Sequence, residues 1–214
     1  MALSLKNFAM NVRSDFGLPL LMGGVIFLTG CNVLPEAQSD PTRSFILSTP
    51  VADARSSNAA DAPTVHLRSV ELASYLRTRA LIVRKGENEI EFREFAQWGE
   101  SLDLGIARVV REELLASGRA GLVQLPGSRT GSAGPSDAEL RIRVLSAEGV
   151  VDGGINFRAV WELSVDGAAG PVTRGDYRAA GLSWDPKNEA SLAAGMSAAV
   201  VGLAANISAA LAKR

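Results

Sequence analysis

The chain has 214 residues, a formal net charge of −1, one cysteine and one histidine. A near-neutral protein has no electrostatic reason to seek nucleic acid, so no nucleic-acid partner is expected. One cysteine excludes an internal disulfide, and a lone histidine leaves little for a metal site or for general-base catalysis. No phosphate-binding loop motif occurs in the sequence either. The composition therefore predicts a protein that is not an enzyme and holds no cofactor and no metal.

The first 30 residues are typical of a bacterial lipoprotein signal peptide. Lys6 and Arg13 supply positive charge, a largely apolar run follows over residues 16–28, and small residues stand directly before Cys31. A transmembrane helix is the alternative, but the apolar run is shorter than the roughly 20 residues that a membrane span needs. We predict that residues 1–30 are removed and that the thiol of Cys31 carries the lipid anchor.

The residues after the cleavage point divide into a short tether and a domain. Residues 31–43 are polar and contain Pro35 and Pro41, which predicts an extended tether. Residues 44–214 are predicted to form a single α/β domain, since their number suits one core. Many lipoproteins of the inner membrane carry Asp after the lipidated cysteine. Because Asn32 is neutral, we expect the outer membrane, with the domain facing the periplasm.

Alternation of apolar and polar residues predicts the strands. It is strict over residues 65–72 and again over 139–148, where Leu140, Ile142 and Val144 alternate with arginines. Further strands are predicted at 45–48, 80–84, 89–92, 123–125, 155–166 and 172–180, with loops at 50–63 and 126–136. The strands near residues 80 and 90 are joined by a hairpin turn, and the last strands complete an antiparallel meander.

Two helices are predicted, at about residues 101–117 and 189–212. Ser101 suits the N-cap of the first helix, and Asp103 suits its positive end. The second helix carries an apolar stripe formed by Leu192, Met196, Leu203, Ile207 and Leu211. Beside it runs a stripe of small residues formed by Ser191, Gly195, Ala198, Gly202, Ala205, Ala209 and Ala212. We expect this stripe to pack on the domain's own sheet, with a subunit or partner contact as the alternative. The elements together predict an α+β fold, with a mixed, largely antiparallel sheet packed against two helices.

The lone histidine, His66, and the tryptophan Trp98 lie within or next to predicted elements. His66 is in phase with Arg68 in an alternating strand, which predicts that it lies on the polar face of the sheet. A catalytic triad would have to use His66, and no nucleophile-elbow motif accompanies it. Trp98 directly precedes the first helix. We expect it to be buried, with Phe95 as an apolar neighbour.

A set of short motifs resembles a known family. The motifs occur in the order Tyr75-Leu76, Leu81-Ile82-Val83-Arg84, Asn88-Glu89-Ile90, Trp98-Gly99-Glu100-Ser101-Leu102 and Ile106-Ala107-Arg108-Val109. This ordered set resembles the auxiliary lipoproteins of ABC-type transport systems, the PqiC-like family that accompanies MCE-domain proteins in lipid transport. Residues 77–79 are more basic than the family pattern.

The resemblance implies a sheet backed by two helices and a non-catalytic role. It implies an envelope component that docks on an MCE-domain protein and cooperates indirectly with an ABC permease and its ATPase. The motif residues implied to bind the partner are Tyr75, Arg84, Trp98 and Glu100. A homo-oligomer is a further expectation. The alternatives are a structural or assembly lipoprotein with no transport role and an envelope hydrolase with an unrecognised site.

Overall fold

The computed structural model describes residues 39–49, 62–128, 137–165 and 171–213. The chain from Pro41 onward forms one compact unit. The predicted signal peptide, Cys31 and most of the predicted tether lie outside the described residues.

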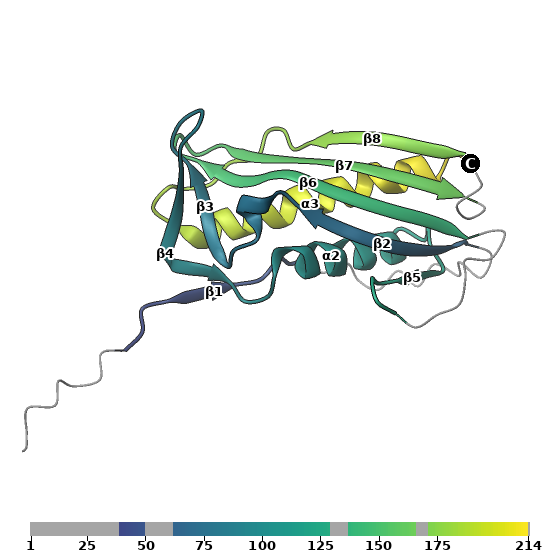
Figure 1. The fold of residues 1–214 in the computed structure, drawn as a ribbon, viewed down its shortest axis with the longest axis horizontal. Coiled ribbons are helices and arrows are strands. Elements are labelled where there is room, and N and C mark those ends of the chain that lie inside the picture. The colour runs from purple at the N-terminus through teal and green to yellow at the C-terminus, as the bar shows by residue number, and fades with distance from the viewer. Residues whose placement is uncertain (1–38, 50–61, 129–136, 166–170, 214) are drawn as a thin grey trace, which may run out of the picture. The chain divides into compact units, whose positions relative to one another are not determined.

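The described residues form an eight-stranded mixed sheet and two long helices, which confirms the predicted α+β fold (Figure 1). In chain order the elements are β1 (Arg43–Phe45), β2 (Thr64–Leu72), the 3-10 turn η2 (Ser74–Leu76), β3 (Ala80–Arg84), β4 (Ile90–Trp98), α2 (Leu102–Ala116), β5 (Leu122–Gln124), β6 (Ala138–Val150), β7 (Ile155–Val165), β8 (Val172–Arg178) and α3 (Glu189–Leu211).

The long strand β6 organises the sheet. One edge of β6 pairs antiparallel with β7, and β7 pairs antiparallel with β8, so the predicted meander is present. The other edge pairs in parallel with β2 near the start of β6 and with β3 near its end. The turn η2 carries the chain from one to the other, and β2 and β3 therefore lie end to end along β6. Beyond them, β5 flanks β2, while β4 and then β1 flank β3.

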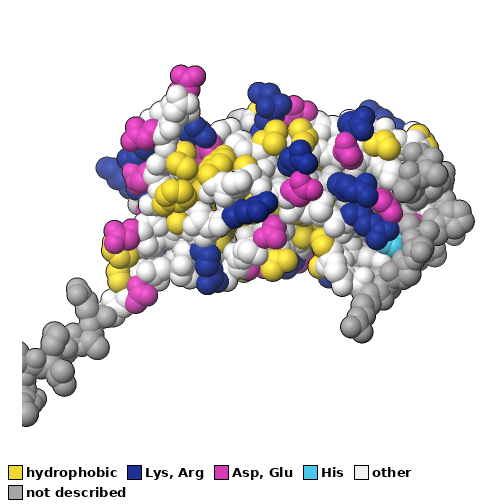
Figure 2. Space-filling view, in the orientation of Figure 1, with side chains coloured by type: hydrophobic (Ala, Val, Ile, Leu, Met, Phe, Trp, Pro, Cys, Tyr) yellow, Lys and Arg dark blue, Asp and Glu magenta, His cyan; other side chains and the backbone are white. Residues whose placement is uncertain are grey.

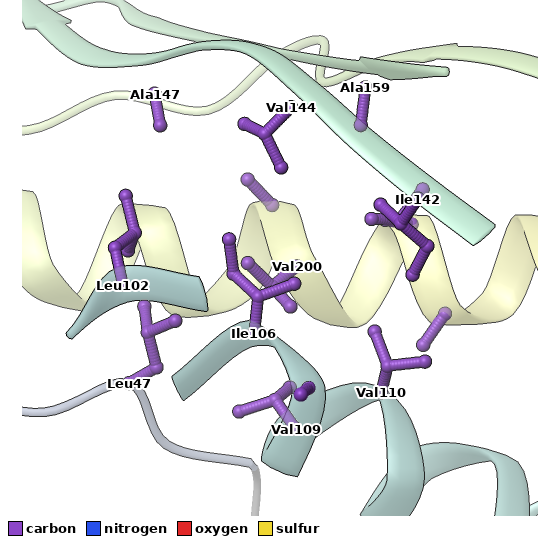
Figure 3. Packing of buried hydrophobic residues seen from close by; sticks show 14 of the residues in the cluster. Leu47, Leu102, Ile106, Val109, Val110, Ile142, Val144, Ala147, Ala159 and Val200 are labelled. Carbon is purple, nitrogen blue, oxygen red and sulfur yellow. The ribbon is translucent and has the colours of Figure 1, made fainter. Parts of the chain in front are cut away.

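Both helices pack against one face of this sheet and against each other. Figure 3 shows Ile142, Val144 and Ala159 of the sheet pointing toward the helices, where Ile106 and Val200 meet them. The largest fully buried side chains are Phe157, Leu47, Leu67, Leu76, Leu81, Ile106, Leu114, Leu140, Ile142, Leu163, Leu192 and Leu203. The apolar residues that alternate along β6 and those that repeat at helical spacing along α2 and α3 all face this one core.

Helix α3 is more apolar than helix α2. By length and composition it could cross a membrane, yet 56% of its apolar window is buried within the domain. Four residues of the predicted apolar stripe, Leu192, Met196, Leu203 and Ile207, are buried, and Leu211 is half-buried against the core. The helix begins where the Asn188 side chain accepts a hydrogen bond from the Ala190 amide. Its apolar face thus serves the core of the domain.

The predicted stripe of small residues does not act as one surface. A Cβ at Gly195 would press on Ile155, and one at Gly202 would overlap the hydroxyl of Tyr177, so both glycines allow the sheet to approach closely. By contrast, four members of the stripe are exposed, namely Ala198, Ala205, Ala209 and Ala212. The prediction of close packing on the sheet is therefore right for the glycines and wrong for these alanines.

Replacing Gly202 with leucine is expected to destabilise the domain. The new side chain must displace Tyr177, and overpacking of this kind typically costs about 1–3 kcal/mol. Ala205→Leu, one turn along the same helix but exposed, is the matched control and should change stability little. Urea unfolding of both variants measures the effect. Equal stability of the two variants would show that Tyr177 can move aside without lowering the free energy of unfolding.

Candidate functional site on the open face of the sheet

The face of the sheet opposite the helices carries most of the charged side chains of the strands. In Figure 1, β2, β6 and β7 pass in front of α3, and the same view in Figure 2 shows positive and negative side chains interspersed across this face. We call it the open face. Its members come from the polar phase of the alternating strands, because successive side chains of a strand point to opposite sides.

Arginines and carboxylates form pairs across neighbouring strands of the open face. Two carboxylates each serve two arginines: Glu139 contacts Arg68 and Arg141, and Asp176 contacts Arg158 and Arg178. Simpler pairs join Arg143 to Glu71 at 3.0 Å and Arg174 to Glu162 at 2.7 Å. Because carboxylates are shared, arginines outnumber acids on this surface, and it presents an excess of positive charge.

These contacts keep the carboxylates of the open face ionised. Hydrogen bonds from Arg68, Arg158 and Arg174 lower the pKa of Glu139, Asp176 and Glu162, respectively. A carboxylate that accepts such charge-assisted bonds loses its proton more readily. These three carboxylates therefore keep their negative charge, and their pairs with arginine, to a lower pH than unpaired carboxylates would.

Two of the predicted partner-binding residues, Tyr75 and Arg84, meet at one buried carboxylate. The side chain of Glu148 in β6 has no solvent exposure. It accepts a hydrogen bond of 2.7 Å from the Tyr75 hydroxyl, one of 2.7 Å from Arg84 Nε, and one of 2.8 Å from Asn156 Nδ2. Burying a carboxylate is costly unless it is paired and hydrogen-bonded, and here both conditions are met.

The Glu148 cluster fastens η2 and β3 to the central strand. The Tyr75 hydroxyl also reaches the carbonyl of Leu145 at 3.3 Å, so one side chain of η2 contacts β6 twice. Burial and the hydrogen bond with Glu148 raise the pKa of Tyr75, so its hydroxyl stays protonated and available as a donor. The hydrogen bond with Glu148 likewise raises the pKa of Arg84. The buried carboxylate of the cluster has three hydrogen-bond donors, and these contacts hold η2 and β3 in place against β6.

The sequence pattern did not reveal Glu148, because the pairing register of β6 shifts before this residue. Strict alternation from Leu140 and Ile142 would put Glu148 in the apolar phase. The register shifts between Val144 and Ser146, however, so the later residues change sides. A lone glutamate in the apolar phase is the signal that could have revealed either a bulge or a buried partner.

The other two predicted partner-binding residues, Trp98 and Glu100, make different contacts. Trp98 ends β4 and is buried, which confirms the expectation for its side chain, whereas its supposed neighbour Phe95 is 50% exposed. Glu100 accepts a hydrogen bond of 2.6 Å from Arg108 of α2, and Arg108 also donates to the carbonyl of Leu47 at 2.7 Å. Glu100 and Arg108 thus connect the segment after β1 to α2, and Trp98 belongs to the core.

His66 lies on the predicted face but is not exposed there. Its register partner in β6 is Glu139 of the open face, yet His66 is only 4% exposed. Gln124 at the end of β5 and residues 125–128 after it line the same small pocket, and His66 Nε2 lies 3.0 Å from a carboxylate oxygen of Asp137. The predicted face of the strand is therefore right, and the low exposure of His66 is a feature that strand periodicity does not predict.

Among the residues that the structure describes, no group of three or more His, Cys, Asp or Glu side chains is placed to hold a metal ion. The chemistry of the open face is that of ion pairs and hydrogen bonds held in fixed positions. Such a surface is suited to binding a macromolecule of complementary charge.

Comparison with known proteins decides the family. The family model described as the ABC-type transport auxiliary lipoprotein component matches residues 45–208. The chain belongs to this family. Members of the family of ABC-type transport auxiliary lipoproteins are transport components of the cell envelope. The match covers every described strand except the first residues of β1, and both helices except the last turn of α3.

Solved structures share the fold of this auxiliary lipoprotein. A crystal structure of an uncharacterized protein has a TM-score of 0.59 at 14% identity, covering 68% of this chain and 90% of that one. A crystal structure of a Xanthomonas campestris protein of the DUF330 family model has a TM-score of 0.56 at 15% identity, covering 78% of this chain and 90% of that one. A search of curated proteins finds no match.

Proposed function

We propose that this protein is a lipid-anchored periplasmic accessory subunit of an ABC/MCE-type lipid transport system, non-catalytic, which docks on the MCE-domain protein through its open face. The family match over residues 45–208 carries the proposal. The ABC permease and the ATPase are indirect partners, since a domain in the periplasm cannot reach a nucleotide-hydrolysing subunit on the far side of the inner membrane.

The open face supports this docking role in two ways. Its arginines are held at defined positions by neighbouring carboxylates, and exposed pairs of this kind contribute only about 0–1 kcal/mol each. A partner's carboxylates can therefore exchange with the internal ones at little cost. In addition, arginine is enriched at protein interfaces, where its planar group makes bidentate contacts. An acidic surface on the MCE-domain protein is the expected complement.

Anchoring at Cys31 is part of the same proposal. The chain between Cys31 and β1 extends at most roughly 40 Å, because each extended residue adds about 3.3–3.6 Å. The domain would then work close to its own membrane. If sorting follows the neutral Asn32, that membrane is the outer one. The subunit would then contact the far end of an MCE assembly that begins at the inner membrane.

Site-specific photo-crosslinking in cells tests the docking surface. A photoreactive phenylalanine analogue placed at Arg143 or Arg174 of the open face is expected to crosslink to the MCE-domain protein. The matched control is Arg111, which is also exposed but lies on α2. Crosslinks to the MCE-domain protein from Arg111 alone would place the docking surface on the helices. Crosslinks only to unrelated envelope proteins would instead favour an assembly role.

A further inference from the structure

A pocket of about 450 Å³ opens beside β2, at the start of α2. Its volume lies in the range of ordinary ligand sites, about 300–1,000 Å³. It exists because β5 pairs with β2 only over Thr64–His66, and none of the described strands covers the same edge of β2 beyond that point. The lining residues are Val70, Glu71, Leu72, Leu76, Arg77, Thr78, Arg79, Ser101, Leu102 and Asp103. None of them belongs to the Glu148 cluster.

The floor of this pocket is apolar. Val70 and Leu72 are in the core-facing phase of β2, where their register partners are Ile142 and Val144. They remain half-buried rather than buried. Leu76 and Leu102, at 1% and 5% exposure, close the floor. The pocket thus gives solvent access to the margin of the hydrophobic core, which is a surface that an alkyl chain would cover favourably.

The rim is charged and incompletely paired. Arg77 is exposed, and its guanidinium makes no hydrogen bond or ion pair with the residues described. Arg79 donates a single hydrogen bond, to the carbonyl of Gly99 at 2.9 Å. Asp103 adds a carboxylate in the first turn of α2, and the other acid, Glu71, already pairs with Arg143. The rim therefore offers free groups of both signs above an apolar floor.

We infer that this pocket binds the headgroup end of a zwitterionic glycerophospholipid, with the phosphate at Arg77 and Arg79, the ammonium group at Asp103, and the first part of an acyl chain on the floor. Guanidinium groups bind phosphate with charge-assisted hydrogen bonds, and a carboxylate forms the same kind of bond with an ammonium group but not with an uncharged glycerol headgroup. The assignment of the ligand as a phospholipid, and not another molecule with a polar and an apolar part, rests on the proposed function. The apolar floor and the two-signed rim stand without it.

Calorimetric titration of the full-length protein, held at constant maltoside detergent, tests the inference. The probe is dihexanoyl-phosphatidylethanolamine, compared with dihexanoyl-phosphatidylglycerol and with inorganic phosphate. Saturable binding of the first is expected, weakened at least about tenfold by Arg77→Glu, since a charge-assisted contact is both lost and reversed. Arg111→Glu, an exposed arginine elsewhere on α2, is the matched control and should bind like the wild type.

A further variant reads out the headgroup. Asp103→Asn is expected to retain binding while losing the preference for the ethanolamine headgroup over the glycerol one. Binding of inorganic phosphate alone with the same affinity would overturn the assignment of a lipid, as would the absence of saturable binding. An equal loss in Arg111→Glu would overturn the assignment of the pocket. None of these outcomes bears on the crosslinking from the open face, so this inference and the docking proposal fail separately.

Discussion

Replacing Cys31 with serine is expected to abolish lipidation and processing, so that only the full-length precursor is found. The serine lacks the thiol that accepts the lipid, so the precursor should be neither lipidated nor cut at this position. Buried methylenes contribute about 0.8 kcal/mol each, and one acyl chain gives only marginal binding whereas several together give stable anchoring. Removing the acceptor therefore removes the whole lipid anchor, and the uncut precursor retains only its apolar run over residues 16–28.

Gel mobility and incorporation of a labelled fatty acid measure this effect, and fractionation of cells locates the protein. Thr29→Ser is a control that keeps a small residue before the cut. The control protein and the wild type should sediment with the membranes. Wild-type protein in the soluble fraction would overturn the lipoprotein assignment. On a density gradient, we expect the outer-membrane fraction, and recovery in the inner membrane would contradict only the role given to Asn32.

The second large effect is expected at the Glu148 cluster. Arg84→Met keeps an unbranched apolar stem but removes the guanidinium group, which leaves the Glu148 carboxylate buried without its cation. Breaking a buried pair by removing one partner typically costs about 3–5 kcal/mol. For a domain of this size the melting temperature should fall by on the order of 10 °C. Tyr75 and Asn156 would still donate to Glu148, but neither carries a charge.

The matched control for Arg84→Met is Arg174→Met, which removes an exposed pair on the same sheet. The Arg174 side chain is 73% exposed in its pair with Glu162, so a loss of at most about 1 kcal/mol is expected. Thermal and urea unfolding compare the two variants. Similar losses in both would mean that Glu148 takes up a proton or water instead of remaining a buried charge.

Elements with a strong period were predicted closely from the sequence. The predicted helix at 101–117 is observed as α2 over Leu102–Ala116, and that at 189–212 as α3 over Glu189–Leu211. The alternating strand predicted at 139–148 is β6, over Ala138–Val150. In these segments the apolar residues repeat at the period of the element and face one core, so local pattern and tertiary packing agree.

The strands β1 and β4, which flank β3, were predicted less well. The strand expected at 45–48 is observed as β1 over Arg43–Phe45, and the strand expected at 89–92 continues through β4 to Trp98. The register between β3 and β4 shifts after Ala80, and Phe92 and Phe95 in β4 are about half exposed. A strand that bends and exposes aromatic residues does not show simple alternation, so periodicity alone underestimates its length.

The candidate site was less predictable than the fold, because its contacts join distant parts of the chain. Motif residues Tyr75 and Arg84 come together only through Glu148, more than 60 positions later. The parallel placement of β2 and β3 beside β6 creates this meeting, and none of these strands encodes the choice of neighbour in its own alternation. The family resemblance identified two members of the cluster, and the structure supplied the carboxylate between them.

The end-to-end arrangement of β2 and β3 along β6 has a consequence for biogenesis. His66 and Asp137, which meet beside the pairing of β2 with β6, are 71 residues apart. Contacts of such high sequence separation form slowly, because the intervening chain must first be closed into a loop. The central strand that β2 and β3 share is missing until β6 has been made. A precursor with this topology is expected to stay unfolded while it is threaded through a translocation channel, and to acquire its sheet only after its last third has emerged.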